Sequence, residues 1–154
     1  MKGHRKQWKR TAALFLGSQC ITLLGSTLVQ MAVVWYVTLA TSSGMWVGAF
    51  SVCSYLPQFL ISFQGGAWAD RCSRKALIAG ADALTAGVTF LMILAMPYMK
   101  TDTVMLTCLL VMSALRSVGA GIQTPAVNAV IPQIVPKEEL MRYNGMNAVM
   151  QSLV

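Results

Sequence analysis

Four long apolar segments follow one another along the chain, separated by short polar joints. They extend over residues 12–39, 45–69, 76–99 and 104–130, and residues 11–69 contain no lysine, arginine, aspartate or glutamate. A helix needs about 20 apolar residues, at about 1.5 Å each, to cross the hydrocarbon core of a bilayer. The pattern therefore predicts four membrane-spanning helices, the first two joined by a turn at residues 41–44.

The last stretch, residues 144–154, is apolar in part but too short to span a membrane. We interpret it as the start of a fifth helix, and a helix lying along the membrane interface is the alternative. No cap or basic flank follows it, which favours the front part of a longer protein. The predicted fold class is an all-α membrane protein with four transmembrane helices plus the start of a fifth, in one domain over residues 1–154.

Composition favours a membrane protein over a soluble domain. Of the 154 residues, 56% are hydrophobic and 11% are charged, and that share of charge is about half of what soluble domains carry. The net charge of +7 would raise nucleic acid as a partner in a soluble protein. Here the basic residues flank apolar segments without an aromatic platform, so we expect membrane lipids and no nucleic acid. One histidine and four separate cysteines offer no metal ligand set, and we expect no cofactor.

Basic residues also predict the orientation of the chain. Ten of the twelve lysines and arginines lie before the first segment, in the joint between the second and third, or after the fourth. By the positive-inside rule these three regions face the cytoplasm. The other two joints contain only Lys100 and face outward. The sequence thus predicts a multi-pass protein with a cytoplasmic N-terminus.

Polar residues recur at helical spacing inside the first two segments. The residues concerned are Gln19, Thr22, Ser26 and Gln30 in the first, and Ser51, Ser54, Gln58, Ser62 and Gly65 in the second. Residues at this spacing share one face of a helix. Such a face can hold neighbouring helices together by hydrogen bonds. It can also line a water-filled cavity, an interpretation that Pro57 favours because proline bends a helix.

Two charged residues lie within the predicted spans. Arg116 is near the middle of the fourth, where a guanidinium costs about 2.5 to 3.5 kcal/mol to insert. Its helical face continues through Ala120, Gln123 and Thr124, so we expect it to point into a polar interior. There it could bind an anion, pair with a carboxylate, gate protons or serve as a structural anchor. Asp82 lies near the inner end of the third span, where a structural role is at least as well supported.

Small residues also recur at helical spacing in the third and fourth spans. The two ladders are Ala79-Ala83-Gly87 and Ser113-Ser117-Gly121. Small residues let membrane helices approach closely. The ladders therefore predict close packing of the third helix against the fourth.

The joint between the second and third spans contains a motif. It reads Gly66-Ala67-Trp68-Ala69-Asp70-Arg71-Cys72-Ser73-Arg74-Lys75. Its glycine permits close backbone approach, its aspartate can accept hydrogen bonds from a helix N-terminus, and its basic residues can meet lipid phosphates or acidic side chains. The stretch resembles the G-x-x-x-D-R-x-G-R-K signature of the major facilitator superfamily, with Ser73 in place of the signature's second glycine.

Further stretches resemble the macrolide-efflux branch of that superfamily. They are residues 115–119, 123–132 and 135–140, together with Trp8-Lys9-Arg10 and Gly80-Ala81-Asp82. The resemblance covers essentially the whole chain. It implies a proton-driven exporter of twelve helices in two halves, of which this chain is an incomplete N-terminal half. The substrate site then lies between the halves.

The resemblance also implies roles for particular residues. The inner gate would comprise Gly66, Asp70, Arg71, Arg74 and Lys75. Arg116 resembles the helix-four arginine associated with proton coupling in drug antiporters, although the antiporter pattern R-x-x-Q-G has one residue more before its glycine. The candidates for proton coupling or the substrate cavity are Arg116, Gln123, Gln19, Ser26, Gln30 and Gln58.

The expected function is proton-coupled efflux of bulky amphipathic compounds such as macrolide antibiotics, which is transport and not an enzyme reaction. The expected partners are a small-molecule substrate, protons and the remaining helices of a full-length transporter in a bacterial inner membrane. The 154 residues alone are expected not to transport. Alternatives are a siderophore or other small-molecule exporter of the superfamily, a self-contained four-helix transporter that works as a dimer, and a membrane protein that only binds or scaffolds.

Overall fold

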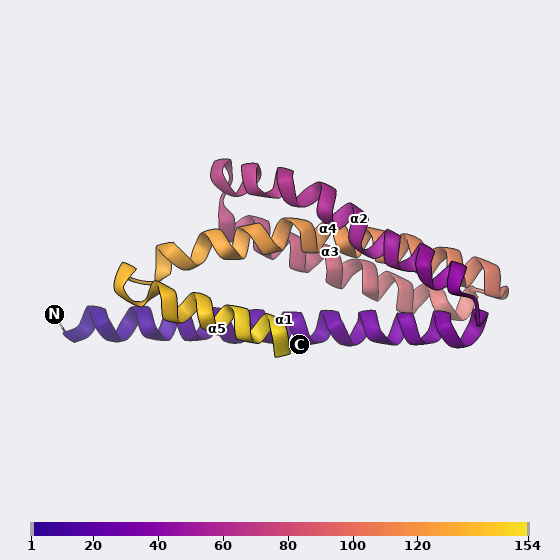
Figure 1. The fold of residues 1–154 in the computed structure, drawn as a ribbon, viewed down its shortest axis with the longest axis horizontal. Helices are drawn as coiled ribbons and strands as arrows, with labels where there is room; N and C mark the ends of the chain where they lie inside the picture. Colours follow the sequence, from indigo (N-terminus) through magenta and orange to yellow (C-terminus); the bar gives the residue numbers. More distant parts are fainter. Residues whose placement is uncertain (1, 154) are drawn as a thin grey trace.

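The computed structural model shows a chain of five helices joined by short connections (Figure 1). It describes residues 2–153, and within them the side chains of residues 8–68 and 72–152. The helices are α1 (Lys2–Thr41), α2 (Gly44–Arg71), α3 (Arg74–Ala95), α4 (Asp102–Ile134) and α5 (Leu140–Leu153), with 3₁₀ turns η1 (Met96–Tyr98) and η2 (Lys137–Glu139). Over the described residues, α1 to α4 are long and apolar enough to cross a membrane. This confirms the predicted fold class.

Local backbone geometry ends the helices at the two tightest joints. At the end of α1, Ser42 takes a left-handed conformation with φ 46° and donates its backbone N–H to the Thr38 carbonyl at 3.0 Å. A residue in this conformation stops a helix by satisfying a terminal carbonyl. At the end of α2, Cys72 is extended and donates to the Trp68 carbonyl at 2.8 Å. Ser73 then precedes α3 at φ −63°, a conformation that needs no glycine.

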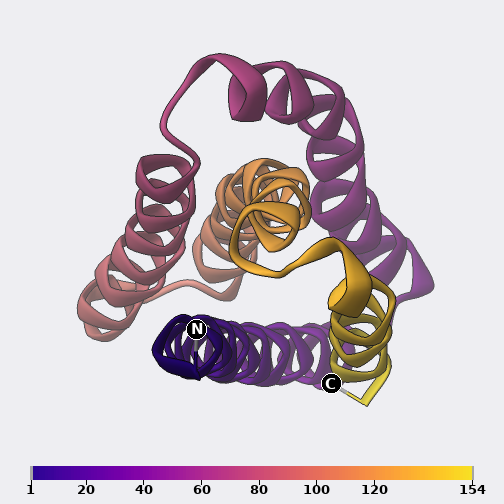
Figure 2. The ribbon, with the colours of Figure 1, turned by 90° about the vertical axis from the view of Figure 1, so that its left-hand side faces the viewer.

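α4 occupies the centre of the bundle. Figure 2, which looks along the bundle, shows α4 between α3 and α2, with α1 beneath them and α5 beside α1. α4 contains more buried residues than any of the other three long helices. The N-terminus, the joint between α2 and α3, and the end of α4 lie at one end of the molecule, and the other two joints lie at the opposite end (Figure 1).

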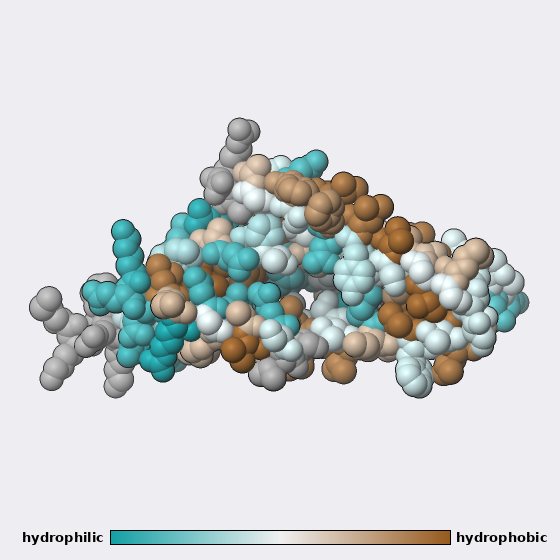
Figure 3. Space-filling model, in the orientation of Figure 1, coloured by the Kyte–Doolittle hydropathy of each residue, from teal (hydrophilic) through white to brown (hydrophobic). Residues whose placement is uncertain are grey.

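Large apolar side chains cover the outside of the bundle. Leu28, Trp35, Met45 and Phe63 are each about two-thirds exposed or more, and Figure 3 shows a hydrophobic band along the outer side of α2. In water such a surface would aggregate, whereas lipid tails cover it at no cost. The surface therefore supports a membrane location for the four long helices.

Buried apolar side chains form two separate clusters. The first apolar cluster comprises Ala12, Ile78, Ala126, Val127, Ile131 and Val135. The second apolar cluster comprises Val33, Val37, Phe50, Met92, Leu106, Leu109 and Met112. The first draws on the start of α1 and the end of α4, and the second on the end of α1 and the start of α4. The clusters thus lie at opposite ends of the bundle and leave a middle zone between them.

The predicted close packing of the third helix against the fourth is confirmed, since Gly119 of α4 approaches Thr85 of α3, but the two small-residue ladders do not make this contact. Ala79, Ala83 and Gly87 are exposed on the outer face of α3. The ladder of α4 faces α2 instead of α3, because a Cβ added at Gly121 would lie 2.8 Å from the Gln58 carbonyl oxygen of α2. The ladder spacing identifies a face of a helix but not the neighbour that meets it, so the sequence could not assign the partner.

Glycines do bring α4 close to both neighbours. A Cβ added at Gly65 of α2 would lie 2.8 Å from the carbonyl oxygen of Gly121, and one added at Gly119 would lie 3.2 Å from Thr85 Cγ2 of α3. At Gly65 the added Cβ would clash with backbone, so only glycine fits there, whereas at Gly119 a Cβ would require Thr85 to shift by a few tenths of an ångström. α2 and α3 are therefore packed against α4 backbone to backbone.

Candidate functional site

A layer of polar side chains fills the zone between the two apolar clusters. This central polar layer comprises Gln19, Ser26 and Gln30 of α1, Ser54 and Gln58 of α2, Asp82, Thr85 and Thr89 of α3, and Ser113, Arg116, Ser117 and Gln123 of α4. All six residues that the sequence proposed for proton coupling or a substrate cavity lie in it. The layer is thus the polar part of an interior that is apolar toward both ends of the bundle.

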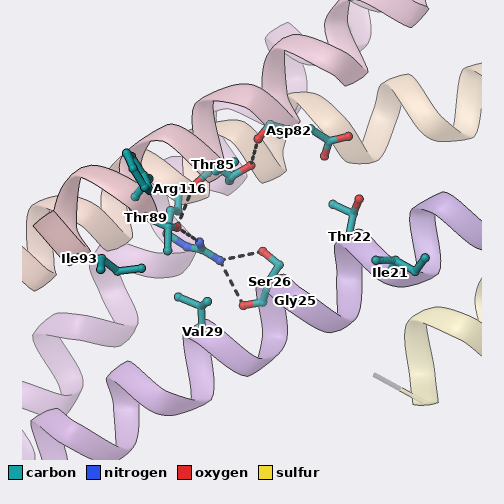
Figure 4. Close-up of a pocket in the computed structure, with 12 residues that line it drawn as sticks. Ile21, Thr22, Gly25, Ser26, Val29, Asp82, Thr85, Thr89, Ile93 and Arg116 are labelled. Atoms are coloured by element: carbon teal, nitrogen blue, oxygen red, sulfur yellow. Dashed lines mark hydrogen bonds between the residues drawn. The ribbon is translucent and has the colours of Figure 1, made fainter.

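Arg116 is the buried cation of this layer, with 8% of its surface exposed. Its Nη2 donates to Ser26 of α1 twice, to Oγ at 2.9 Å and to the carbonyl oxygen at 3.2 Å, and its Nη1 donates to Thr89 Oγ1 of α3 (Figure 4). Among the described side chains, no ion pair joins Arg116 to a carboxylate. A guanidinium has five N–H donors. Arg116 thus bridges three helices through neutral partners, and its three hydrogen bonds leave further N–H donors available.

A second bridge joins the same three helices through Gln123 of α4. Its Nε2 donates to Asp82 Oδ1 of α3 at 2.9 Å and lies 3.3 Å from Gln19 Oε1 of α1. Both amide protons of Gln123 therefore have acceptors, one charged and one neutral. Asp82 was not among the candidates from the sequence, although its position as the one carboxylate within the predicted spans was the available signal.

Hydroxyl groups join α1 and α2 to α4. Gln30 Nε2 donates to Ser54 Oγ at 2.9 Å, and Ser54 Oγ lies 2.5 Å from Ser113 Oγ of α4. Ser54 also reaches the Phe50 carbonyl of its own helix at 2.9 Å. This chain of bonds explains how three neutral polar residues are satisfied in a membrane interior.

Pro57 creates a further acceptor within α2. Proline has no N–H, so the carbonyl four residues earlier, that of Cys53, loses its helical donor. Ser117 Oγ of α4 lies 3.3 Å from this carbonyl oxygen and 2.8 Å from the Ala114 carbonyl of its own helix. The hydroxyl thus offers the freed carbonyl a donor from a neighbouring helix, which is how proline is tolerated inside a membrane.

Two cavities adjoin the central polar layer. The larger, of about 480 Å³, lies between α1, α3 and α4, and Thr22, Ser26, Asp82, Thr85, Thr89 and Arg116 are its polar lining residues. The smaller, of about 280 Å³, lies between α1, α2 and α4, and its polar lining includes Gln30, Ser54, Gln58 and Ser113. Arg116 and Ser26 line both cavities, so the hydrogen bonds that join these two residues separate the two cavities. Figure 3 shows the surface hollowed near the middle of the molecule.

The polar stripe of the second span only partly reaches the cavities. Ser54 and Gln58 line the smaller cavity. Ser51 and Ser62 instead donate to carbonyls of their own helix, at 2.9 Å and 2.7 Å. Thr124, which the sequence placed on the face of Arg116, is exposed and likewise bonds within α4. Helical spacing therefore overestimates the polar lining, because serine and threonine can satisfy themselves on their own backbone.

The motif between α2 and α3 is described in part. The side chains of Asp70 and Arg71 lie outside the described residues. A Cβ at Gly66 would meet nothing within 4 Å, and the close approach that the sequence expected there occurs at Gly65. Arg74 Nη1 donates to the Ala129 carbonyl of α4 at 2.7 Å, and Lys75 is exposed. Arg74 thus ties the start of α3 to the end of α4.

The comparisons with known proteins agree with the four long apolar helices. The chain matches, over residues 9–154, the major facilitator model described as transmembrane secretion effector. The chain belongs to the major facilitator superfamily. The resemblance seen in the sequence is thereby confirmed, and this superfamily consists of multi-pass membrane transporters that act on small molecules.

Bacterial transporters of this superfamily are similar to the chain. Macrolide efflux protein A of Streptococcus pyogenes is 32% identical over 146 residues, which cover 95% of this chain and 35% of the relative. The protein of the same name from Enterococcus faecalis is 31% identical over 105 residues, which cover 68% and 32%. The staphyloferrin A transporter of Staphylococcus aureus is 23% identical over 125 residues, which cover 80% and 30%.

The chain therefore spans about a third of the length of these curated relatives. The comparison with solved structures finds no match. The family assignment rests on sequence, and the arrangement of the polar layer rests on the structure of this chain.

Proposed function

We propose that this chain forms part of an exporter that moves bulky amphipathic compounds, such as macrolides, out of the cell in exchange for protons. The observation that supports this most is the central polar layer around Arg116. A guanidinium at the middle of a span costs about 2.5 to 3.5 kcal/mol to insert, and intramembrane charges mark substrate and ion pathways. Two cavities open onto this one residue. A protein that only scaffolds has no use for them.

The proposed mechanism is alternating access, in which substrate and protons bias an equilibrium between two orientations of the transporter halves. In this mechanism Arg116, Gln123, Gln19, Ser26, Gln30 and Gln58 contribute to the substrate cavity or to proton coupling. Their hydrogen bonds connect α1 to α2, α3 and α4. Since the site of the whole transporter would lie between two halves, we propose that the 154 residues alone do not export.

An inner gate is the proposed role of the motif between α2 and α3. It would involve Gly66, Asp70, Arg71, Arg74 and Lys75, as the family resemblance implies. The bond from Arg74 to the Ala129 carbonyl supports this, because it fixes the start of α3 against the end of α4. Basic residues in this joint can also contact lipid phosphates of the inner leaflet.

We test this function with a chimera, in which residues 9–154 replace the matching segment of the Streptococcus pyogenes relative. Accumulation of a radiolabelled macrolide is measured in bacteria that lack their own pump, with and without a protonophore. The chimera should lower accumulation several-fold, the protonophore should abolish the effect, and the 154-residue chain alone should have none. Arg116→Gln should abolish export. Arg142→Gln, at a side chain that is 74% exposed, is the matched control and should not.

A chimera that is present in the membrane at normal abundance but does not lower macrolide accumulation would overturn the proposed function. Lowered accumulation by the 154-residue chain alone would overturn the claim that it needs further helices. Siderophores are the second candidate cargo, because one relative is named as a staphyloferrin A transporter. A second chimera on that relative, assayed for transport of staphyloferrin A, distinguishes the two cargoes.

We also propose that the N-terminus, the joint between α2 and α3, and the end of α4 face the cytoplasm of a bacterial cell. The structure has these three regions at one end of the bundle (Figure 1), and together with the segment after α4 they contain ten of the twelve basic residues. Cys72 in that joint is exposed. In a variant with the other cysteines replaced, a membrane-impermeant maleimide should label Cys72 only after the cells are opened. The variant Lys100→Cys should be labelled in intact cells, and the reverse pattern would invert the topology.

A further inference from the structure

The acidic side chains of this chain are unevenly placed. Of the five aspartates and glutamates, Asp70 and Asp102 lie at helix ends, and Glu138 and Glu139 lie in the 3₁₀ turn after α4. Asp82 alone lies well inside a long helix, two turns from the start of α3. It lines the larger cavity, and Figure 4 shows its carboxylate directed away from Arg116. No ion pair between the two exists among the described side chains.

Proton exchange needs a group that can gain and lose a proton. Arg116 cannot serve, since a guanidinium stays protonated in proteins. The other residues that face Asp82 are not titratable. They are Thr22 and Ser26 of α1, Thr85 and Thr89 of α3, and Gln123 of α4, and Arg116 is the one other charged group on this cavity. Among the described residues that line the larger cavity, Asp82 is therefore the single one that can change its charge.

The contacts of Asp82 also connect its charge state to another helix. Gln123 Nε2 donates to Asp82 Oδ1 at 2.9 Å and lies 3.3 Å from Gln19 Oε1. A hydrogen bond to a charged acceptor is about twice as strong as one to a neutral acceptor. While Asp82 is ionised, the Gln123 amide is held toward α3. Once Asp82 is neutral, this pull weakens, and the bond of the same amide to Gln19 of α1 becomes the stronger by comparison.

We propose that Asp82 is the proton-binding group of this transporter segment, and that the Gln123 amide transmits its protonation state from α3 to α1. Proton uptake from the cavity forms one O–H bond on the carboxylate, and release breaks that bond again, so no other reactant is needed. This proposal rests on the proposed proton-coupled export and identifies the residue that carries the proton. Asp82 binds the proton, and Gln123 is a positioning residue.

The first test uses the 154-residue chain in lipid nanodiscs, with ¹³C-labelled aspartate and ¹⁵N-labelled glutamine. The Asp82 carboxyl resonance, assigned by its loss in Asp82→Asn, should titrate once. The side-chain amide resonance of Gln123 should shift with the same midpoint. Asn keeps an oxygen that can accept from Gln123, so this variant should fold. The matched control is Asp102→Asn at an exposed position, which should leave the Gln123 titration unchanged.

The second test separates this inference from the proposed function. Proteoliposomes of the chimera are assayed for uphill transport driven by a proton gradient and for exchange of labelled against unlabelled substrate. Asp82→Asn should lose uphill transport and keep exchange, whereas Asp102→Asn should keep both. Uphill transport by Asp82→Asn, or an Asp82 resonance that does not titrate, would overturn the proposal. A wild-type chimera that transports nothing would instead overturn the proposed function, and the resonance titration would still decide whether Asp82 exchanges a proton.

Discussion

Replacing Gly65 by alanine tests the contact between α2 and α4. The added Cβ would lie 2.8 Å from the Gly121 carbonyl oxygen, 3.0 Å from Pro125 Cγ and 3.3 Å from Ile122 Cα. All three atoms belong to the backbone or to a rigid ring, so they cannot rotate away and the helices must separate. Overpacking of this kind costs about 1 to 3 kcal/mol. Alanine also favours a helix over glycine by about 1 kcal/mol, which offsets part of that cost.

A substitution at the neighbouring glycine separates the steric cost of the added Cβ from the gain in helix propensity. A Cβ at Gly66 would meet nothing within 4 Å, so Gly66→Ala gains the same helix propensity without a clash. The two variants should therefore differ by about 1 to 3 kcal/mol in the free energy of unfolding, with Gly65→Ala the less stable. The measurement is unfolding of the purified chain by SDS in mixed micelles, followed by far-UV circular dichroism. Equal free energies for the two variants would refute the close packing of α2 on α4.

Three further substitutions have predicted effects in the same unfolding assay. Ser117→Ala removes the donor near the Cys53 carbonyl and should cost about 1 kcal/mol, whereas Ser18→Ala, whose exposed hydroxyl bonds within α1, should cost less. Ser42→Gly should stabilise the chain by up to about 1 kcal/mol because Ser42 has φ 46°, and Ser43→Gly, at φ −119°, should not. Arg116→Lys should lower the free energy of unfolding by about 1 to 3 kcal/mol, since lysine lacks the planar fork that reaches Ser26 and Thr89 together. A loss no larger than that caused by Arg142→Lys would contradict this.

The helices could be predicted from the sequence because a bilayer imposes a length and a polarity on each span. Residues 11–69 show this best, since their lack of charge leaves room for two spans and little else. The face of α1 with Gln19, Ser26 and Gln30 could also be predicted, because 3.6 residues per turn places them together whatever their neighbours are. The structure puts all three in the central polar layer.

The pairing between helices could not be predicted from the same patterns. The ladder residues of α4 meet α2 and not α3, and the expected close approach moves from Gly66 to Gly65. A periodic pattern defines a direction around one helix axis, whereas pairing depends on how several helices are placed relative to one another. The bond between Gln123 and Asp82 illustrates this, because it joins residues 41 positions apart that no spacing rule connects.

α1 is held differently from α2 and α3, and this difference bears on the proposed mechanism. α2 and α3 approach α4 closely at glycines, and at the crossing of α2 with α4 an added Cβ would lie 2.8 Å from a backbone oxygen. In the central polar layer, α1 instead meets α4 through the bonds of Arg116 to Ser26 and of Gln123 to Gln19. Hydrogen bonds between membrane helices contribute only about 0.6 kcal/mol each on average. Displacing α1 at this level is therefore less costly than separating α2 from α4. Because Ser26 lines both cavities, such a displacement would join them, which is the kind of rearrangement that alternating access requires.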